Sequence, residues 1–426
     1  MFSQLNNGEV LSKLVVKVEA QIAGIHKEID QRIDNNQYRV LQSYQKYQVS
    51  DSHFIPSTGY GYDDMGRDTL EKIYADVFGG EAALVRPQII SGTHAISIAL
   101  FGILRPNDEL LYITGKPYDT LEEIVGIRGS GVGSLKDFNI GYNTVELIDN
   151  GNIDYEEIRR SIHEQTKMIG IQRSKGYATR PSFTINQMKE MIAFVKEINP
   201  NIIVFVDNCY GEFVEDIEPC HVGADLIAGS LIKNPGGGLA KTGGYIVGKK
   251  DYVKACSYRM TSPGIGAEAG ASLYSLQEMY QGFFLAPHIV GQALKGAVFT
   301  SAILEEMGLN TNPKWNGPRT DLIQSVQFDD KDLMIAFCQS IQYTSPINSH
   351  VTPYPAYMPG YEDDVIMAAG TFIQGASIEL TADGPLRPPY VAYVQGGLTY
   401  SHVKISICIA LDQLITKNLI KVGKQG

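Results

Sequence analysis

Lys233 has the sequence surroundings that best suit a nucleophilic amine. It follows the apolar pair Leu231 and Ile232 and precedes a Pro-Gly-Gly-Gly turn, after an expected strand over 225–229. Partial removal from water lowers the pKa of a lysine and yields the neutral amine that attacks a carbonyl carbon. A single lysine is most often an exposed surface residue, but these flanking residues favour the nucleophile.

An acidic residue earlier in the chain could serve the same reaction. The very apolar stretch 202–206 is expected to form a buried strand, and Asp207 follows it directly. Ligand groups lie at the carboxyl ends of strands in parallel sheets. An ionised acid at that place can hold a protonated heterocyclic nitrogen. Capping of the following turn by Asp207 is an equally good interpretation.

A phosphate site is expected at the start of an apolar helix. Ser91, Gly92 and Thr93 precede that helix, so the chain can approach an anion closely. The free N–H groups of a first helical turn bind phosphate. The same residues would also suit a helix start that binds nothing. Ser230, close before Lys233, could add a hydroxyl group to the phosphate site.

These three features together predict pyridoxal 5'-phosphate as the cofactor. That cofactor requires a lysine that forms a Schiff base, an acid at the pyridine nitrogen and a phosphate site. No Gly-x-Gly-x-x-Gly motif opens a helix after a strand, and the stretch 243–250 lacks the Ser or Thr of a nucleotide-binding loop. No His-Glu-x-x-His motif occurs, and Cys209, Cys220 and His221 have poor spacing for a metal. We therefore predict no metal site.

The order of the expected elements indicates an α/β fold. Short apolar runs without alternation are separated by helical segments between about residues 69 and 248. This pattern predicts a mostly parallel sheet covered by helices on both faces, and a smaller α+β domain follows. In that second domain we expect strands at 322–328, 366–369, 377–380 and 390–394. The predicted domains are an N-terminal helical arm (1–50), a large cofactor-binding α/β domain (51–288) and a C-terminal α+β domain (289–426).

The composition excludes several classes of function. The 426 residues carry a net charge of −11 and no block of Lys and Arg, so nucleic-acid binding is disfavoured. The longest apolar stretches are shorter than the ~20 residues of a bilayer-spanning helix, and the charged N-terminal segment is unlike a secretory signal. Five widely separated cysteines are typical of reduced thiols. We therefore expect a cytoplasmic protein that binds neither nucleic acid nor membranes.

Several segments resemble a known enzyme family in their order along the chain. The segments that resemble the whole family are Gly66–Glu71, Glu81–Val85, Ser91–Thr93, Tyr118–Thr120, Val206–Asn208 and Ser230–Lys233. The segments that resemble one branch of this family are Thr58–Asp63, Gly229–Gly238, Arg259–Gly266, Pro359–Asp363 and Ser377–Tyr390. The sequence is similar to the fold-type I pyridoxal phosphate enzymes of cysteine and methionine metabolism, the cystathionine lyases and methionine gamma-lyases. The most similar branch is called methionine gamma-lyase-like or aluminium resistance protein. This resemblance covers nearly the whole chain and implies a seven-stranded type of sheet.

The resemblance also implies roles for individual residues. Lys233 would hold the cofactor and move the proton of the substrate's alpha carbon, and Asp207 would pair with the pyridine nitrogen. Tyr118 would stack on the cofactor ring. The phosphate would be bound by Ser91, Gly92, Thr93 and Ser230. In the wider group a Tyr and an Arg of the neighbouring subunit complete the site, and Tyr60, Tyr62 and Arg67 occupy that region here at a different spacing.

The residue that binds the substrate carboxylate departs from the family pattern. The wider group uses an Arg in an Arg-x-Ser segment, where this chain has Lys404 before Ser406. Lysine lacks the two-pronged geometry of arginine. We therefore expect Arg173 or Arg387 to bind the carboxylate in preference to Lys404.

The predicted activity is cleavage of a carbon–sulfur bond in a sulfur-containing amino acid by beta or gamma elimination, as in cystathionine beta-lyase or methionine gamma-lyase. The products would be a thiol, a 2-oxo acid and ammonia. Another pyridoxal phosphate reaction, of the aminotransferase or aldolase type, is the first alternative. A non-catalytic stress protein that binds aluminium through carboxylates such as Glu362, Asp363 and Asp364 is the second. Family members assemble as dimers or tetramers, so we expect a homotetramer built from two dimers.

Overall fold

The computed structural model describes residues 1–421 and divides the chain into two compact units. The large unit is Asn35–Ala286, and the small unit joins Met1–Asp34 to the chain from Pro287 onward. One division therefore falls next to the predicted boundary at 288/289. The other falls inside helix α1 (Gly8–Lys46), rather than at 50/51.

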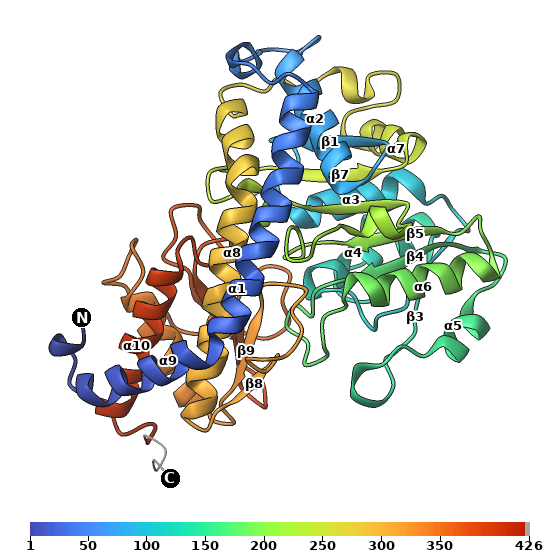
Figure 1. Cartoon of the computed structure of the whole chain (residues 1–426). Coiled ribbons are helices and arrows are strands. Elements are labelled where there is room, and N and C mark those ends of the chain that lie inside the picture. The colour runs from blue at the N-terminus through green and yellow to red at the C-terminus, as the bar shows by residue number, and fades with distance from the viewer. Residues whose placement is uncertain (422–426) are drawn as a thin grey trace. The chain divides into compact units, whose positions relative to one another are not determined.

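A seven-stranded sheet forms the centre of the large unit, with strand order β1-β7-β6-β5-β4-β2-β3 (Figure 1). The four pairs from β6 to β3 are parallel, and β7 is antiparallel to both of its neighbours. This confirms the predicted mostly parallel sheet. The strands are β1 (Ala82–Arg86), β2 (Glu109–Tyr112), β3 (Gly141–Thr144), β4 (Thr166–Gln172), β5 (Ile203–Asp207), β6 (Leu226–Ser230) and β7 (Gly244–Gly248).

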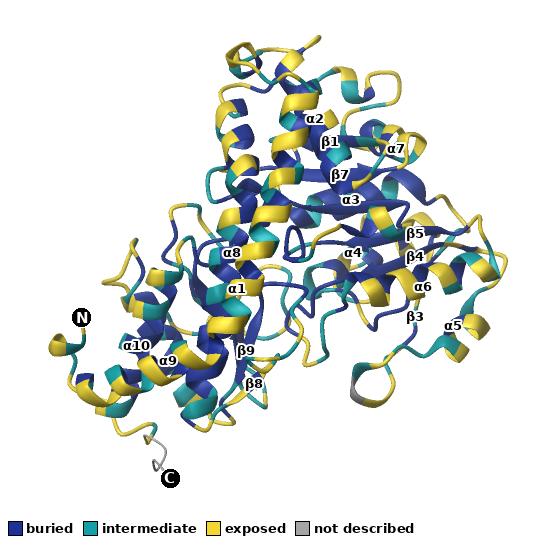
Figure 2. Cartoon of the chain, in the orientation of Figure 1, coloured by how far each residue is buried: buried dark blue, intermediate teal, exposed yellow. Residues whose placement is uncertain are grey.

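Helices cover this sheet and bury their apolar residues against it. The core joins residues such as Ala99 and Ile103 of a helix to Leu110, Phe205 and Ile246 of the strands. Figure 2 shows these strands as buried and the outer sides of the helices as exposed. The helices are α2 (Met65–Phe78), α3 (Gly92–Ile103), α4 (Glu122–Val125), α5 (Tyr155–Ser161), α6 (Ile185–Ile198) and α7 (Lys250–Met260), and α8 (Leu276–Glu306) begins in this unit.

Helix α6 shows how local sequence sets an element of this unit. Its buried residues recur at three- and four-residue spacing, which gives the helix one apolar face. Thr184 precedes the helix and its side chain accepts a hydrogen bond from the backbone N–H of Gln187. The side chain of Gln187 in turn accepts from the backbone N–H of Thr184, at 2.9 Å. This reciprocal pair satisfies N–H groups that a helix start otherwise leaves without partners.

The small unit contains a five-stranded antiparallel sheet and two further helices. The strand order is β10-β11-β12-β9-β8. This agrees with the predicted α+β character of the C-terminal region. The elements are β8 (Asn310–Asn312), β9 (Gln324–Gln327), α9 (Lys331–Tyr343), β10 (Val365–Ala368), β11 (Thr381–Pro385), β12 (Val391–Gln395) and α10 (Tyr400–Thr416).

The strand predicted at 377–380 is wrong. Strand β11 begins only at Thr381, and the preceding residues form bends. The reason is Glu379, whose carboxylate accepts the backbone N–H groups of Phe372 and Ile373, both at 2.8 Å. These bonds hold the chain in a loop, although its buried apolar residues follow a strand-like alternation.

We predict that Thr184→Ala destabilises the large unit by about 1 kcal/mol, because the N–H of Gln187 loses its acceptor. Urea unfolding of the full-length chain measures the change. Thr184→Ser keeps the hydroxyl oxygen and should behave like the wild type. Equal stability of the alanine variant and the wild type would contradict the capping role.

Candidate functional site

The predicted catalytic and phosphate-binding segments meet at one edge of the large sheet. Gln172 at the end of β4 pairs in register with Asp207 at the end of β5, and Ala228 of β6 is the next partner of Asp207. Ser230 ends β6. The carboxyl ends of three parallel strands therefore lie side by side, which is where ligands bind in such sheets.

Asp207 is a buried carboxyl group, 7% exposed. Burial raises its pKa, while a hydrogen bond from the backbone N–H of Cys209 (3.2 Å) and the positive charges of Lys233 and Arg180 act in the opposite direction. A carboxyl group in such surroundings ionises most readily when a positive group is brought against it. Asp207 is therefore suited to hold a protonated ring nitrogen.

Lys233 lies in the turn directly after β6 and is half-buried. Its Nζ atom is 4.0 Å from the centroid of the Tyr210 ring. Its charge acts on both Asp207 and Cys209, so these groups belong to one electrostatic site. The next residue, Asn234, donates a side-chain N–H to the backbone oxygen of Glu212 at 2.9 Å.

The start of helix α3 approaches the end of β6 closely. A Cβ atom added to Gly92 would lie 3.2 Å from both the Cβ of Ser230 and the Sγ of Cys209. The side chain of Ser91 accepts the backbone N–H of His94 at 3.0 Å, so its hydroxyl group caps the helix. The N–H groups of a first helical turn have no partner within the helix. Gly92, Thr93 and Ser230 therefore fit a phosphate group, and the tight approach requires glycine at position 92.

Tyr118 lies in a turn that contacts this region. The hydroxyl groups of Thr120 and Thr93 are 3.1 Å apart, which links the Tyr118 turn to the start of α3. A Cβ atom on Gly176 would lie 2.6 Å from Cδ2 of Tyr118, and Gly176 has a φ of 55°. Glycine is thus needed at position 176 both for its backbone conformation and for the packing of the tyrosine.

Tyr60, Tyr62 and Arg67 belong to one loop of the large unit and the start of the helix that follows it. The rings of Tyr60 and Tyr62 stack at 5.4 Å and are 72% and 57% exposed. Arg67 is buried and donates to the backbone oxygens of Gly61 and Gly270, at 2.5 and 3.1 Å. Arg67 therefore shapes the loop that presents the two tyrosines.

Both arginines predicted for the substrate carboxylate have acidic partners. Arg173 is fully buried and its guanidinium contacts Glu215 at 3.1 Å and Glu218 at 3.2 Å. Arg387, in the small unit, pairs with Asp363 at 3.0 Å and is 42% exposed in its side chain. Lys404 pairs with Glu19 at 2.7 Å. The two carboxylates around Arg173 favour a structural role for that residue.

A buried polar network that the sequence analysis missed lies behind Asp207. Tyr245 donates its hydroxyl hydrogen to Glu212 Oε1 at 2.6 Å, and Asn208 contacts both Tyr245 (3.3 Å) and Glu218 (3.1 Å). Burial raises the pKa of Glu212 to about 8. The available signal was the polar run 207–212 directly after an apolar strand, because buried polar residues there need partners.

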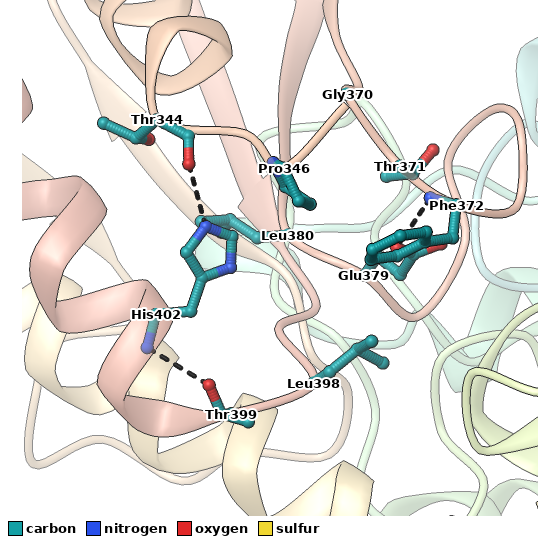
Figure 3. A pocket seen from close by; sticks show the side chains of 10 residues that line it. All are labelled: Thr344, Pro346, Gly370, Thr371, Phe372, Glu379, Leu380, Leu398, Thr399 and His402. Carbon is teal, nitrogen blue, oxygen red and sulfur yellow. Dashed lines mark hydrogen bonds between the residues drawn. The ribbon is translucent and has the colours of Figure 1, made fainter. Parts of the chain in front are cut away.

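A cavity of about 350 Å³ lies in the small unit and contains none of the predicted site residues. Figure 3 shows His402 and Glu379 among its lining side chains. One ring nitrogen of His402 lies 3.0 Å from the backbone oxygen of Thr344. Within residues 1–421 no group of three or more His, Cys, Asp and Glu side chains is arranged to hold a metal ion. No helix in this part of the chain is long and apolar enough to cross a bilayer.

We predict that the free energy of unfolding decreases between about pH 4.5 and about pH 8 because of Glu212. The folded state binds this proton more tightly than the unfolded state, so stability is highest below the unfolded pKa and is lost as the pH rises through the folded pKa. The loss should be on the order of 5 kcal/mol. Unfolding measured across this range should show a flatter profile for Glu212→Gln than for the wild type.

The exposed Glu164 provides a matched control for this experiment. Glu164→Gln should keep the pH dependence of the wild type. Parallel profiles for Glu212→Gln and the wild type would contradict the assignment of the titration to Glu212.

Comparison with known proteins identifies the family. A model of the methionine gamma-lyase family matches residues 11–415. The uncharacterized protein YnbB of Bacillus subtilis is 76% identical over 421 residues, which are 99% of this chain and 100% of that protein. The structure of a Bacillus cereus protein has 78% identity and a TM-score of 0.92, covering 94% of this chain and 99% of that one.

Two further solved structures are similar to this chain. A carbon-sulfur lyase involved in aluminium resistance from Clostridium novyi NT has 49% identity and a TM-score of 0.92, with 96% of each chain covered. The pyridoxal-5'-phosphate dependent protein YhfS of Escherichia coli shares the fold, with a TM-score of 0.62 at 16% identity over 91% of this chain and 97% of that one. The match to the family model covers almost all of the sequence, and the chain therefore belongs to the methionine gamma-lyase family.

Proposed function

We propose that the protein is a pyridoxal phosphate-dependent lyase that cleaves a carbon–sulfur bond of a sulfur-containing amino acid. The observation that carries this proposal is that Lys233 lies near enough for its charge to act on buried Asp207, after neighbouring strands, in a chain of the methionine gamma-lyase family. The name of the Clostridium novyi relative, a carbon-sulfur lyase, supports the same reaction. Beta and gamma elimination both fit these features.

The residues at the sheet edge fit the chemical groups of the cofactor. Asp207 offers a carboxylate to the pyridine nitrogen, and Gly92, Thr93 and Ser230 offer N–H and hydroxyl groups to the phosphate. When bound, pyridoxal phosphate supplies an electron sink for negative charge at the substrate's alpha carbon. Tyr118 would cover one face of its ring.

Lys233 has two tasks in this proposal. Its amine would hold the cofactor until substrate binds. The freed amine then takes the proton from the substrate's alpha carbon, as a general base. Loss of the thiol, followed by hydrolysis, leaves a 2-oxo acid and ammonia.

Arg387 is our proposed partner of the substrate carboxylate. Its guanidinium is partly exposed and has the carboxylate of Asp363 as an ionic partner, which a substrate carboxylate could replace. Arg173 is less suited, because two buried or partly buried glutamates hold it inside the large unit. The Asp363–Arg387 pair also belongs to the acidic run 362–364, the candidate site of the alternative aluminium-binding function.

We further propose a cytoplasmic homotetramer built from two dimers. The loop with Tyr60 and Tyr62 exposes large apolar surface, as do Ile55, Leu273 and Tyr274. These segments lie together, since Gly270 donates to the backbone oxygen of Tyr60 and Leu273 donates to that of Ser57. Exposed aromatic residues on a firmly held loop are typical of an interface with another subunit. The five cysteines are free thiols, as expected for a reducing compartment.

We predict that Lys233→Ala abolishes release of thiol and 2-oxo acid from cystathionine and methionine, because no amine remains to hold the cofactor or move the proton. Borohydride reduction followed by peptide mass spectrometry should find a pyridoxyl group on Lys233 of the wild type and none on that peptide of the variant. Lys241→Ala, at a lysine that is 74% exposed, is the control and should stay active.

Three outcomes would count against this function. Activity that survives in Lys233→Ala would disprove the role of this lysine. Cofactor binding without thiol release from any sulfur amino acid, but with amino-group exchange against a 2-oxo acid, would favour an aminotransferase. Aluminium binding by protein free of the cofactor would favour the non-catalytic alternative.

We predict that the double variant Tyr60→Ser, Tyr62→Ser shifts the protein from a tetramer to a smaller assembly, because the interface loses two aromatic rings. Light scattering after gel filtration measures the mass. Tyr343→Ser removes a tyrosine that is 59% exposed on α9 and should leave the mass unchanged. A monomeric wild type would contradict the proposed assembly.

A further inference from the structure

Tyr210 is a buried tyrosine with an uncommon backbone conformation next to the proposed catalytic lysine. It is 7% exposed and has a φ of 65°, in the left-handed region. Its ring centroid lies 4.0 Å from Nζ of Lys233. Nothing in the sequence pattern assigns a function to this residue.

The left-handed conformation at Tyr210 does not follow from local preference. Bulky residues rarely adopt positive φ, and such conformations persist only where surrounding contacts impose them. Phe213, three residues later, also has a positive φ, of 61°. Two aromatic residues with positive φ in one short segment indicate that contacts with the surrounding chain fix its backbone path.

Buried polar groups hold the segment that directly follows Tyr210. The backbone N–H of Phe213 donates to Glu218 at 2.8 Å, and its backbone oxygen accepts from the side chain of Asn36 at 3.0 Å. A Cβ atom on Gly211 would lie 2.3 Å from Cδ of Arg173, so the arginine packs directly on the backbone. These contacts fix the direction in which the Tyr210 side chain leaves the chain.

The turn that carries Lys233 is tied to the same segment. Asn234 donates its side-chain N–H to the backbone oxygen of Glu212 at 2.9 Å, and Asn234 is fully buried. The lysine and the tyrosine are each one or two residues from this hydrogen bond. Their mutual position is therefore set by a contact between the two turns and not by the flexible lysine side chain alone.

A cation at this distance from an aromatic ring is attracted by the ring's negative face. The attraction acts on the ammonium form and is nearly absent for the neutral amine. The charge of Lys233 also acts on two titratable groups of the neighbouring segment, Asp207 and Cys209.

We propose that Tyr210 is a positioning residue for Lys233: its ring face receives the ammonium whenever the lysine is not bonded to the cofactor, and it releases the amine when the proton is lost. The proposal rests on the proposed role of Lys233. It adds the face of the Tyr210 ring as the position of the ammonium group while Lys233 is not bonded to the cofactor. It also explains why a tyrosine is kept in a backbone conformation that tyrosine disfavours.

Labelling of Lys233 across a pH range tests this contact. The full-length chain, freed of cofactor, is treated with an amine-reactive reagent, and the Lys233 peptide is quantified by mass spectrometry. In Tyr210→Leu the labelling midpoint should fall by about one pH unit, because the ammonium loses its attraction to the ring. Tyr210→Phe keeps the ring and should retain the wild-type midpoint.

Leucine is a matched replacement because it keeps an apolar, unbranched Cβ in the same backbone conformation as tyrosine. If Tyr210→Leu fails to fold, as judged by thermal unfolding, Tyr210→Met replaces it. A folded variant without a ring but with the wild-type midpoint would overturn the proposal. So would Tyr210→Phe with the same shift as Tyr210→Leu, because the hydroxyl group would then be responsible.

The same samples separate this proposal from the proposed function. Borohydride reduction of the wild type with pyridoxal phosphate should place the pyridoxyl group on Lys233. Its absence from that peptide would disprove the cofactor role even if the labelling shift is found. Its presence together with unchanged labelling in Tyr210→Leu would disprove only the contact with the ring.

Discussion

The low solvent exposure of the Asp207 carboxyl group is the constraint on which the site depends. A carboxylate removed from water is unfavourable unless positive charge or hydrogen-bond donors compensate for it. Here burial raises the pKa of Asp207, and the N–H of Cys209 and the charge of Lys233 oppose that effect only in part. A ligand that brings a protonated ring nitrogen to this carboxyl would supply the missing charge. The strand end is thus prepared for such a ligand by its surroundings.

The buried polar groups around Arg173 and Glu212 have a different role: they fix the backbone that follows strand β5. Arg173 bridges Glu215 and Glu218, and Tyr245 donates to Glu212, so most of these buried groups have partners. Oε2 of Glu212 has no hydrogen-bond partner among the described residues. A raised pKa keeps that group neutral near pH 7, which limits the cost of burying it. The network therefore stabilises the turn that contains Tyr210 and Phe213. It also contains Glu212, a carboxyl group that ionises at mildly alkaline pH.

Local patterns were sufficient to predict much of the fold but little of this network. The strand ending at Asp207 and the cap at Thr184 follow from runs and spacings that one segment contains. By contrast, the loop before β11 was mistaken for a strand, because the side chain of Glu379 binds backbone several residues away. The contacts of Arg173 with Glu215 and Glu218 are likewise not visible in the sequence, since nothing near Arg173 identifies these residues as its partners. Pairings between side chains that are far apart in the sequence produce no periodic pattern along the chain.

The position of Tyr210 depends on contacts between distant segments and on a backbone conformation that the sequence does not show. A sequence shows where glycine permits a left-handed turn, and Gly92 and Gly176 are found where close approach requires them. Tyrosine gives no such signal, so its positive φ can be known only from the folded chain. The conformation follows from buried contacts at Gly211 and Phe213, which in turn depend on Arg173 and Glu218. Arg173 packs on Gly211 and Glu218 accepts from Phe213, so we expect this buried pair to set the position of the Tyr210 ring through the backbone.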